Sequence, residues 1–135
     1  MSPTQSQSPK QLVLSLYDAF NRGDIATILG SLSADIEWID EGPAVVPFAG
    51  TYHGTAEVGQ FFGKLATSTA FDEFVVDASV AEGDRVVVLG HFTARNKANG
   101  KSLSTRYAHA WIVRDGKATQ FVAYGDTAAV AAIYA

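Results

Sequence analysis

The first third of the chain carries apolar residues at helical spacing. Two stripes recur every three or four residues, and this predicts two amphipathic helices. Ser8 and Pro9 are residue types that cap and open a helix, whereas Gly23 ends the first stripe and Asp24 caps the second. The stripes consist of Leu12, Val13, Leu16, Tyr17 and Phe20, followed by Ile25, Ile28, Leu29 and Leu32.

A short strand is predicted next, and its polar end raises the first question about chemistry. Side chains in a strand alternate between two faces, so Ile36, Trp38 and Asp40 share one face of the segment 35–40. Two interpretations are open. Either the strand stops at Ile39 and Asp40 belongs to a turn, or this face lines a cavity and Asp40 is its acid or base.

The segment that follows is irregular but apolar. Residues 41–54 are too rich in proline and glycine for regular structure, yet they include Val45, Val46 and Phe48. An apolar loop of this kind indicates a flap over a pocket. After Gly54 a third helix is predicted, with an apolar side formed by Val58, Phe61, Phe62 and Leu65.

The second half of the chain changes to a period of two. Asn99-Gly100 and Asp115-Gly116 favour the tight turns of β-hairpins because both pairs accept positive φ angles. An alanine-rich helix is predicted over 126–134. The strands are expected at 74–81, 85–94, 102–113 and 118–124.

Helices grouped before a run of hairpins indicate an α+β fold. Long antiparallel strands twist and curl, so we expect a cone-shaped, curved sheet of mixed or antiparallel strands, with three helices on its concave side enclosing a pocket. Residues 1–8 are expected to form a disordered tail, and residues 9–135 a single domain.

Composition narrows the classes of function. The 135 residues are 47% hydrophobic and 18% charged, and the net charge of −4 argues against a general nucleic-acid binder. The chain has no cysteine, no recognisable secretory signal and no apolar run of membrane-spanning length, so a cytoplasmic protein is expected. His53, His91 and His109 lack the spacing of metal ligands, and no nucleotide-binding motif occurs, so no cofactor or metal is expected.

Four stretches resemble one known family. "YDAFNRGDIATI", "SADIEWID", "FAGTYHG" and "DGKATQFVAYGDT" are similar to the SnoaL-like branch of the nuclear transport factor 2-like superfamily. The resemblance covers nearly the whole chain after the tail and implies a cystatin-like α+β roll with a small-molecule pocket. The superfamily includes ketosteroid isomerases, polyketide cyclases, limonene epoxide hydrolases and members without known activity.

The resemblance to the isomerases places Asp40 where those enzymes keep a general-base aspartate. A carboxylate that faces an apolar pocket loses hydration, its pKa rises, and it becomes a better proton acceptor near neutral pH. The two isomerase hydrogen-bond donors fall at Leu16 and Ala108, which cannot donate, and Tyr17 lies one residue late. Steroid isomerisation is therefore not the favoured reaction.

Arg106 and Asp126 are the other catalytic candidates. Arg106 shares a strand face with Ala108 and Ala110, whose small side chains leave room in front of it, so we expect it to anchor developing negative charge in the pocket. The alternative is an arginine paired with Asp40 or Asp126. Asp126 resembles the acid/base aspartate of SnoaL-like enzymes, but it is also well placed to cap the final helix.

The remaining assignments concern the pocket wall and the assembly. Tyr17, Trp38, Phe48, Tyr52, Phe62 and Ala108 are expected to line the pocket. His109 and Trp111, on the strand face opposite Arg106, are assigned to the convex side of the sheet, where a large-residue patch predicts a homodimer. The function expected is cofactor-independent isomerisation or cyclisation of an apolar, enolisable carbonyl compound; the alternative is a non-catalytic binding or dimerisation module.

Overall fold

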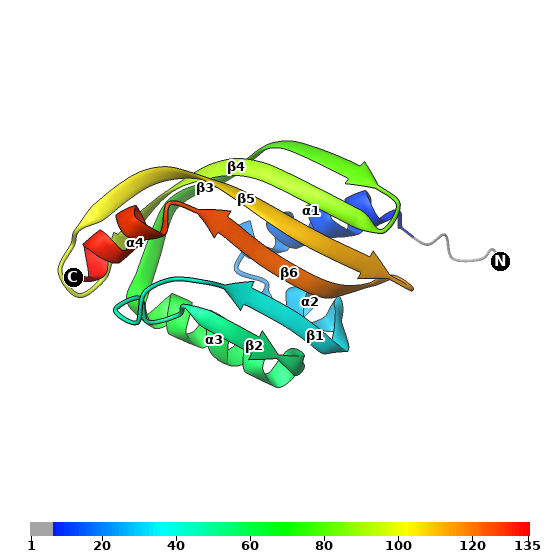
Figure 1. Cartoon of the computed structure of the whole chain (residues 1–135), viewed down its shortest axis with the longest axis horizontal. Helices are drawn as coiled ribbons and strands as arrows, with labels where there is room; N and C mark the ends of the chain where they lie inside the picture. The colour runs from blue at the N-terminus through cyan, green and yellow to red at the C-terminus, as the bar shows by residue number, and fades with distance from the viewer. Residues whose placement is uncertain (1–6) are drawn as a thin grey trace.

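The computed structural model describes residues 7–135 and shows an arched sheet with three helices beneath it (Figure 1). The helices beneath the arch are α1 (Pro9–Asn21), α2 (Ile25–Gly30) and α3 (Gly54–Ser68). A fourth helix, α4 (Thr127–Tyr134), lies at one end of the sheet beside the turn between β4 and β5. The expected α+β architecture is confirmed.

The sheet has six strands in the order β2-β1-β6-β5-β4-β3. Strands β1 and β6 pair in parallel, and every other neighbouring pair is antiparallel. The strands are β1 (Leu32–Asp40), β2 (Gly50–His53), β3 (Thr69–Glu82), β4 (Arg85–Asn96), β5 (Ser102–Arg114) and β6 (Lys117–Gly125).

The local signals at the helix ends act as predicted. The Ser8 hydroxyl accepts a hydrogen bond from the Gln11 amide, and the Gln11 side chain accepts one from the Ser8 amide, so α1 begins with a reciprocal capping box. Asp24 caps α2 through the Thr27 amide. Of the tail expected at 1–8, residues 1–6 lie outside the described part of the chain, and Ser8 belongs to the first helix cap.

Several strand boundaries differ from the predicted ones. β1 begins at Leu32 instead of residue 35, and β3 begins at Thr69 instead of residue 74. The end of the flap forms the short edge strand β2, which pairs with β1. Four residues carry too little alternation to be recognised alone, and β2 is fixed by its partner strand rather than by its own sequence.

The concave face of the sheet packs on the helices to form one core. Val13 and Val58 from the helices and Ile36, Val86 and Val88 from the sheet are fully buried. The curvature leaves space between the sheet and the helices near the carboxyl ends of β1 and β6. That space is the candidate site.

Candidate functional site

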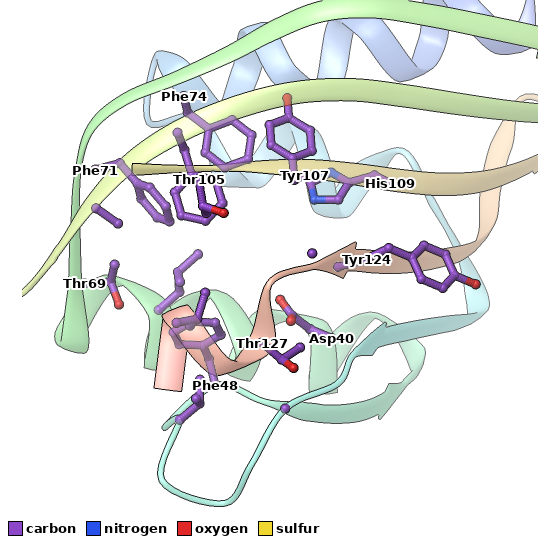
Figure 2. A pocket seen from close by; sticks show the side chains of 18 of the residues that line it. Asp40, Phe48, Thr69, Phe71, Phe74, Thr105, Tyr107, His109, Tyr124 and Thr127 are labelled. Carbon is purple, nitrogen blue, oxygen red and sulfur yellow. The ribbon is translucent and has the colours of Figure 1, made fainter. Parts of the chain in front are cut away.

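A cavity of about 160 Å³ lies between the sheet, the helices and the flap, and it is partly open to solvent. Its walls come from all four helices, the segment 41–49 and five strands, and they are mostly aromatic and aliphatic (Figure 2). An apolar cavity of about 150 Å³ holds a benzene molecule. The space suits a small, largely apolar compound.

The inner wall of β5 is aromatic. Tyr107 and Trp111 are buried, and His109 lies between them on the same face, under the helices. The strand register also places these residues on the concave face, because Trp111 pairs with Val86 and His109 with Val88, and both valines are fully buried. The assignment of His109 and Trp111 to the convex side is therefore wrong.

The same register places Arg106 on the outer face, where its side chain is exposed at the rim of the cavity. Its neighbour on β4 is His91, which is bonded to Asp77 on the solvent side. Ala108 also faces outward, opposite the exposed Leu89. The prediction that small residues mark the pocket side fails because large aromatic rings fill the concave face, while small side chains suffice on the outer face.

Asp40 lies where β1 ends and its carboxylate projects into the cavity (Figure 2). It shares the inner face with Ile36 and Trp38, as the strand alternation predicts. Burial raises the pKa of Asp40 to about 7, because the apolar surroundings disfavour the ionised form. No salt bridge offsets this effect among residues 7–135. Asp40 is thus the last residue of the strand and faces the cavity instead of standing in a turn.

A single small residue separates Asp40 from His109 across the sheet. Ala123 on β6 is in register with Asp40 on one side and with His109 on the other. Adjacent strands lie about 5 Å apart, so the two Cα atoms are separated by roughly 10 Å. The methyl group of Ala123 leaves a slot between a carboxylate and an imidazole, and both project into the cavity (Figure 2).

His109 belongs to a chain of hydrogen bonds that starts at Trp111. The Trp111 indole N–H donates to the Tyr17 hydroxyl at 3.0 Å, and Tyr17 Oη lies 2.5 Å from His109 Nδ1. Burial raises the pKa of Tyr17 well above its usual value, so the phenol keeps its proton. Tyr17 lies one residue, about a hundred degrees around the helix, after the position that matches the isomerase donor. It still lines the cavity, and its hydroxyl group is bonded to His109.

The His109 ring is held in place and uncharged. It stacks on Tyr107 at 4.2 Å between ring centroids and meets Phe121 edge-on at 4.8 Å. Burial lowers the pKa of His109 to about 3, so the imidazole is neutral at physiological pH. The sequence-based prediction put this residue on the convex side of the sheet; the alternation of Tyr107, His109 and Trp111 with small residues was the signal that could have placed it in the cavity wall.

The other predicted wall residues divide into two groups. Trp38, Phe48 and Phe62 line the cavity. Tyr52 is buried outside it, behind Phe61, and its hydroxyl donates to the Phe48 carbonyl oxygen. Tyr52 therefore supports the flap instead of meeting a ligand.

Asp126 caps the last helix. Its carboxylate accepts a hydrogen bond from the Ala129 amide at 2.9 Å, and the residue is exposed at the mouth of the cavity. Of the two interpretations, the structure supports the cap. At the other end of α4 the Tyr134 hydroxyl bonds to Thr69, and Asn96 bonds to the Ile133 carbonyl oxygen, so the helix is tied down over the cavity.

The remaining histidines lie outside the cavity. The His91 side chain is 41% exposed, and its bond to Asp77 raises its pKa. His53 is exposed at the start of α3. Within the described part of the chain, no group of three or more histidines and carboxylates is placed to hold a metal ion. No described helix is long and apolar enough to cross a membrane.

Comparison with known proteins agrees with this architecture. The sequence profile of the SnoaL-like domain matches residues 13–121. No curated protein matches the chain.

Solved structures give close matches over nearly the full length. An NTF2-like protein from Burkholderia thailandensis E264 is 32% identical, with a TM-score of 0.85 over 96% of this chain and 98% of that one. TerC, determined in co-crystals with polyporic acid, is 30% identical, with a TM-score of 0.83 over 94% and 98%. A Pseudomonas putida KT2440 protein provisionally described as a polyketide cyclase shares the fold at 20% identity, with a TM-score of 0.78 over 96% and 99%.

Proposed function

We propose that this chain, which belongs to the SnoaL-like domain family of the nuclear transport factor 2-like superfamily, binds a small apolar carbonyl compound and moves a proton at carbon through Asp40. The observation that carries the proposal is the position of Asp40. A carboxylate with a pKa of about 7 projects into an aromatic cavity without a counter-ion among the described residues.

The pKa of Asp40 matches the task of a general base. A carboxylate with an ordinary pKa near 4 is too weak a base to remove a proton from carbon efficiently at neutral pH. At a pKa near 7, about half of the Asp40 carboxyls are ionised at pH 7, and each is a stronger proton acceptor than an exposed aspartate. Ketosteroid isomerases likewise use carboxyl groups whose pKa values are set by their surroundings.

The step is a proton transfer from carbon to oxygen. Asp40 takes a proton from the carbon beside a carbonyl, the C–H bonding electrons form the enolate, and negative charge collects on the carbonyl oxygen. Return of the proton to another carbon gives isomerisation. Attack of the enolate on a second carbonyl carbon gives aldol cyclisation, in which the new alkoxide is protonated. Neither route changes the oxidation level of the compound or requires a cofactor.

The relatives support a small organic ligand. TerC, 30% identical to this chain, was co-crystallised with polyporic acid. The likeness to the Pseudomonas putida protein supports the shared fold alone.

A second candidate function is binding without turnover. The observation that favours it is the loss of the two isomerase donor positions, since Leu16 lies in the apolar wall and Ala108 faces outward. In this alternative the cavity and its aromatic walls stay the same, and Asp40 contributes a polar contact only.

Exchange of carbon-bound protons in D₂O distinguishes the two functions. The probe is 2-tetralone, a neutral aromatic ketone with enolisable protons, and NMR follows their replacement by deuterium. We expect the protein to accelerate exchange and Asp40→Asn to lower the rate by about a hundredfold or more, the usual contribution of a general base.

Asp35→Asn is the matched control, because Asp35 lies on the same strand but is exposed on the other face. Circular dichroism verifies that both variants fold. Binding of 2-tetralone without acceleration, or equal rates for Asp40→Asn and the wild type, would establish the binding module instead.

A further inference from the structure

We infer that His109 Nε2–H is the hydrogen-bond donor that holds the carbonyl oxygen of the ligand, and that Tyr17 and Trp111 fix the imidazole in the tautomer that makes this possible. The inference rests on the proposed function and names its substrate class: a neutral carbonyl compound whose oxygen gains charge. Arg106 does not serve as the anchor, because it is exposed at the cavity rim, on the sheet face opposite His109.

The direction of the hydrogen bonds follows from the chemistry of the three groups. An indole N–H can only donate, so the Tyr17 oxygen accepts from Trp111. The one proton of Tyr17 then needs an acceptor, and His109 Nδ1 is the one bonded to it within residues 7–135. A proton on Nδ1 would instead leave the buried Tyr17 hydroxyl without an acceptor, which is unfavourable.

A neutral imidazole that accepts at Nδ1 carries its proton on Nε2. No hydrogen bond to Nε2 occurs among the described residues, although His109 lines the cavity. The ring cannot turn this donor away freely, because Tyr107 stacks on it and Phe121 meets it edge-on. The structure therefore offers His109 Nε2–H as an oriented donor to the occupant of the cavity; the indole N–H of Trp38, another cavity residue, also has no partner among the described residues.

The donor and the base lie on opposite sides of one slot. Asp40 and His109 both flank Ala123 in register, from β1 and β5. An enolisable carbonyl has its acidic C–H and its oxygen on adjacent carbons, so it can meet a base and a donor that face each other across a narrow gap. Enolate charge forms at the donor as the base removes the proton, which is the arrangement that lowers such a barrier.

The polar groups of the slot also discriminate by charge. Asp40 is an acid, His109 is neutral, and Arg106 is exposed on the outer face. A ligand carboxylate placed beside Asp40 would meet a like charge, and among residues 7–135 the cationic side chain that reaches the cavity, Arg106, stands at its rim on the outer face. A neutral ketone is the ligand class that the slot favours.

The first test is spectroscopic and needs no ligand. Histidine side chains labelled with ¹⁵N report their tautomer through long-range proton–nitrogen correlations. We expect His109 to be the Nε2–H tautomer in the wild type at pH 7, and Tyr17→Phe to give a mixture of tautomers in a folded protein. An Nδ1–H tautomer, or an imidazolium, would overturn the assignment.

The second test compares 2-tetralone with tetralin, which has the same rings without the carbonyl. A neutral hydrogen bond is worth about tenfold in affinity, so the wild type should prefer 2-tetralone by about that factor. His109→Gln keeps an N–H near the position of Nε2 and should retain most of the preference. His109→Asn is too short to reach and should lose it.

His91, which lies on the outer face of the sheet and does not line the cavity, supplies the control, since His91→Asn should leave the preference unchanged. Equal preference in the Gln and Asn variants would overturn the donor role. Failure of Asp40→Asn to slow proton exchange is a separate result, because it would refute the proposed function only. The role of His109 would then still be decided by its tautomer and by the ratio of the affinities for 2-tetralone and tetralin.

Discussion

Replacing Asp40 by asparagine should change how stability depends on pH. The side chain has a pKa of 3.8 in an ordinary environment and about 7 in the folded protein. Between these two values the unfolded chain releases its proton while the folded protein keeps it. The folded state then binds more protons than the unfolded state, and the free energy of unfolding falls as the pH rises.

The size of the effect follows from the two pKa values. They differ by about three pH units, and each unit corresponds to about 1.4 kcal/mol, so the wild type should lose at most about 4 kcal/mol between pH 4 and pH 7. The cavity is partly open to solvent, which makes this figure an upper limit. An asparagine side chain cannot ionise, so the Asp40→Asn variant should lack this slope.

The assay is urea unfolding of both proteins at pH 4, 5, 6, 7 and 8, followed by circular dichroism. The difference between the two unfolding free energies cancels the titration of all other groups. We expect the variant to gain stability relative to the wild type steadily up to about pH 7 and no further above it. A difference that stays constant from pH 4 to pH 8 would show that Asp40 is not desolvated, and the reasoning would fail.

Three further predictions rest on other parts of the molecule. His109 has its pKa lowered from 6.5 to about 3, so the wild type should lose up to about 5 kcal/mol relative to His109→Phe as the pH falls through this window, measured by the same urea series. Gly90→Ala should destabilise by about 3 kcal/mol or more, because a β-carbon there would overlap the Val75 carbonyl oxygen and the Tyr107 hydroxyl. Gly63→Ala should instead stabilise the protein by about 0.5–1 kcal/mol, because a β-carbon at this position of α3 meets open space and alanine favours a helix. Thermal melts measure both changes, and a similar loss of stability in the two variants would contradict the packing described at Gly90. If the chain forms a homodimer through the outer sheet face, where Leu89 is 43% exposed, Leu89→Lys should give a monomer in light scattering while the wild type elutes as a dimer; a monomeric wild type would rule the dimer out.

The fold was accessible from the sequence because its signals are local. Ser8, Pro9, Gly23 and Asp24 act at the helix ends as their chemistry dictates, and Asp115-Gly116 turns the last hairpin with positive φ at both residues. The short strand β2 was not accessible, because it depends on pairing with β1.

The site was accessible only in part. Strand alternation correctly grouped Ile36, Trp38 and Asp40, but it left open which face of β5 is concave. Alternation fixes which residues share a face; the sign of the curvature depends on contacts with helices far away in sequence, such as that of Tyr17 with Trp111. The error moved Arg106 into the pocket and His109 out of it.

The most direct test of the account is the pKa of Asp40 itself. Carbon-13 NMR of the aspartate carboxyl groups, with Asp40→Asn used to assign the signal, measures it in the folded protein without a ligand. We expect a midpoint near pH 7. A midpoint near pH 4 would mean that the carboxylate is bathed in water, and it would contradict the claim that Asp40 is a base held in an apolar cavity.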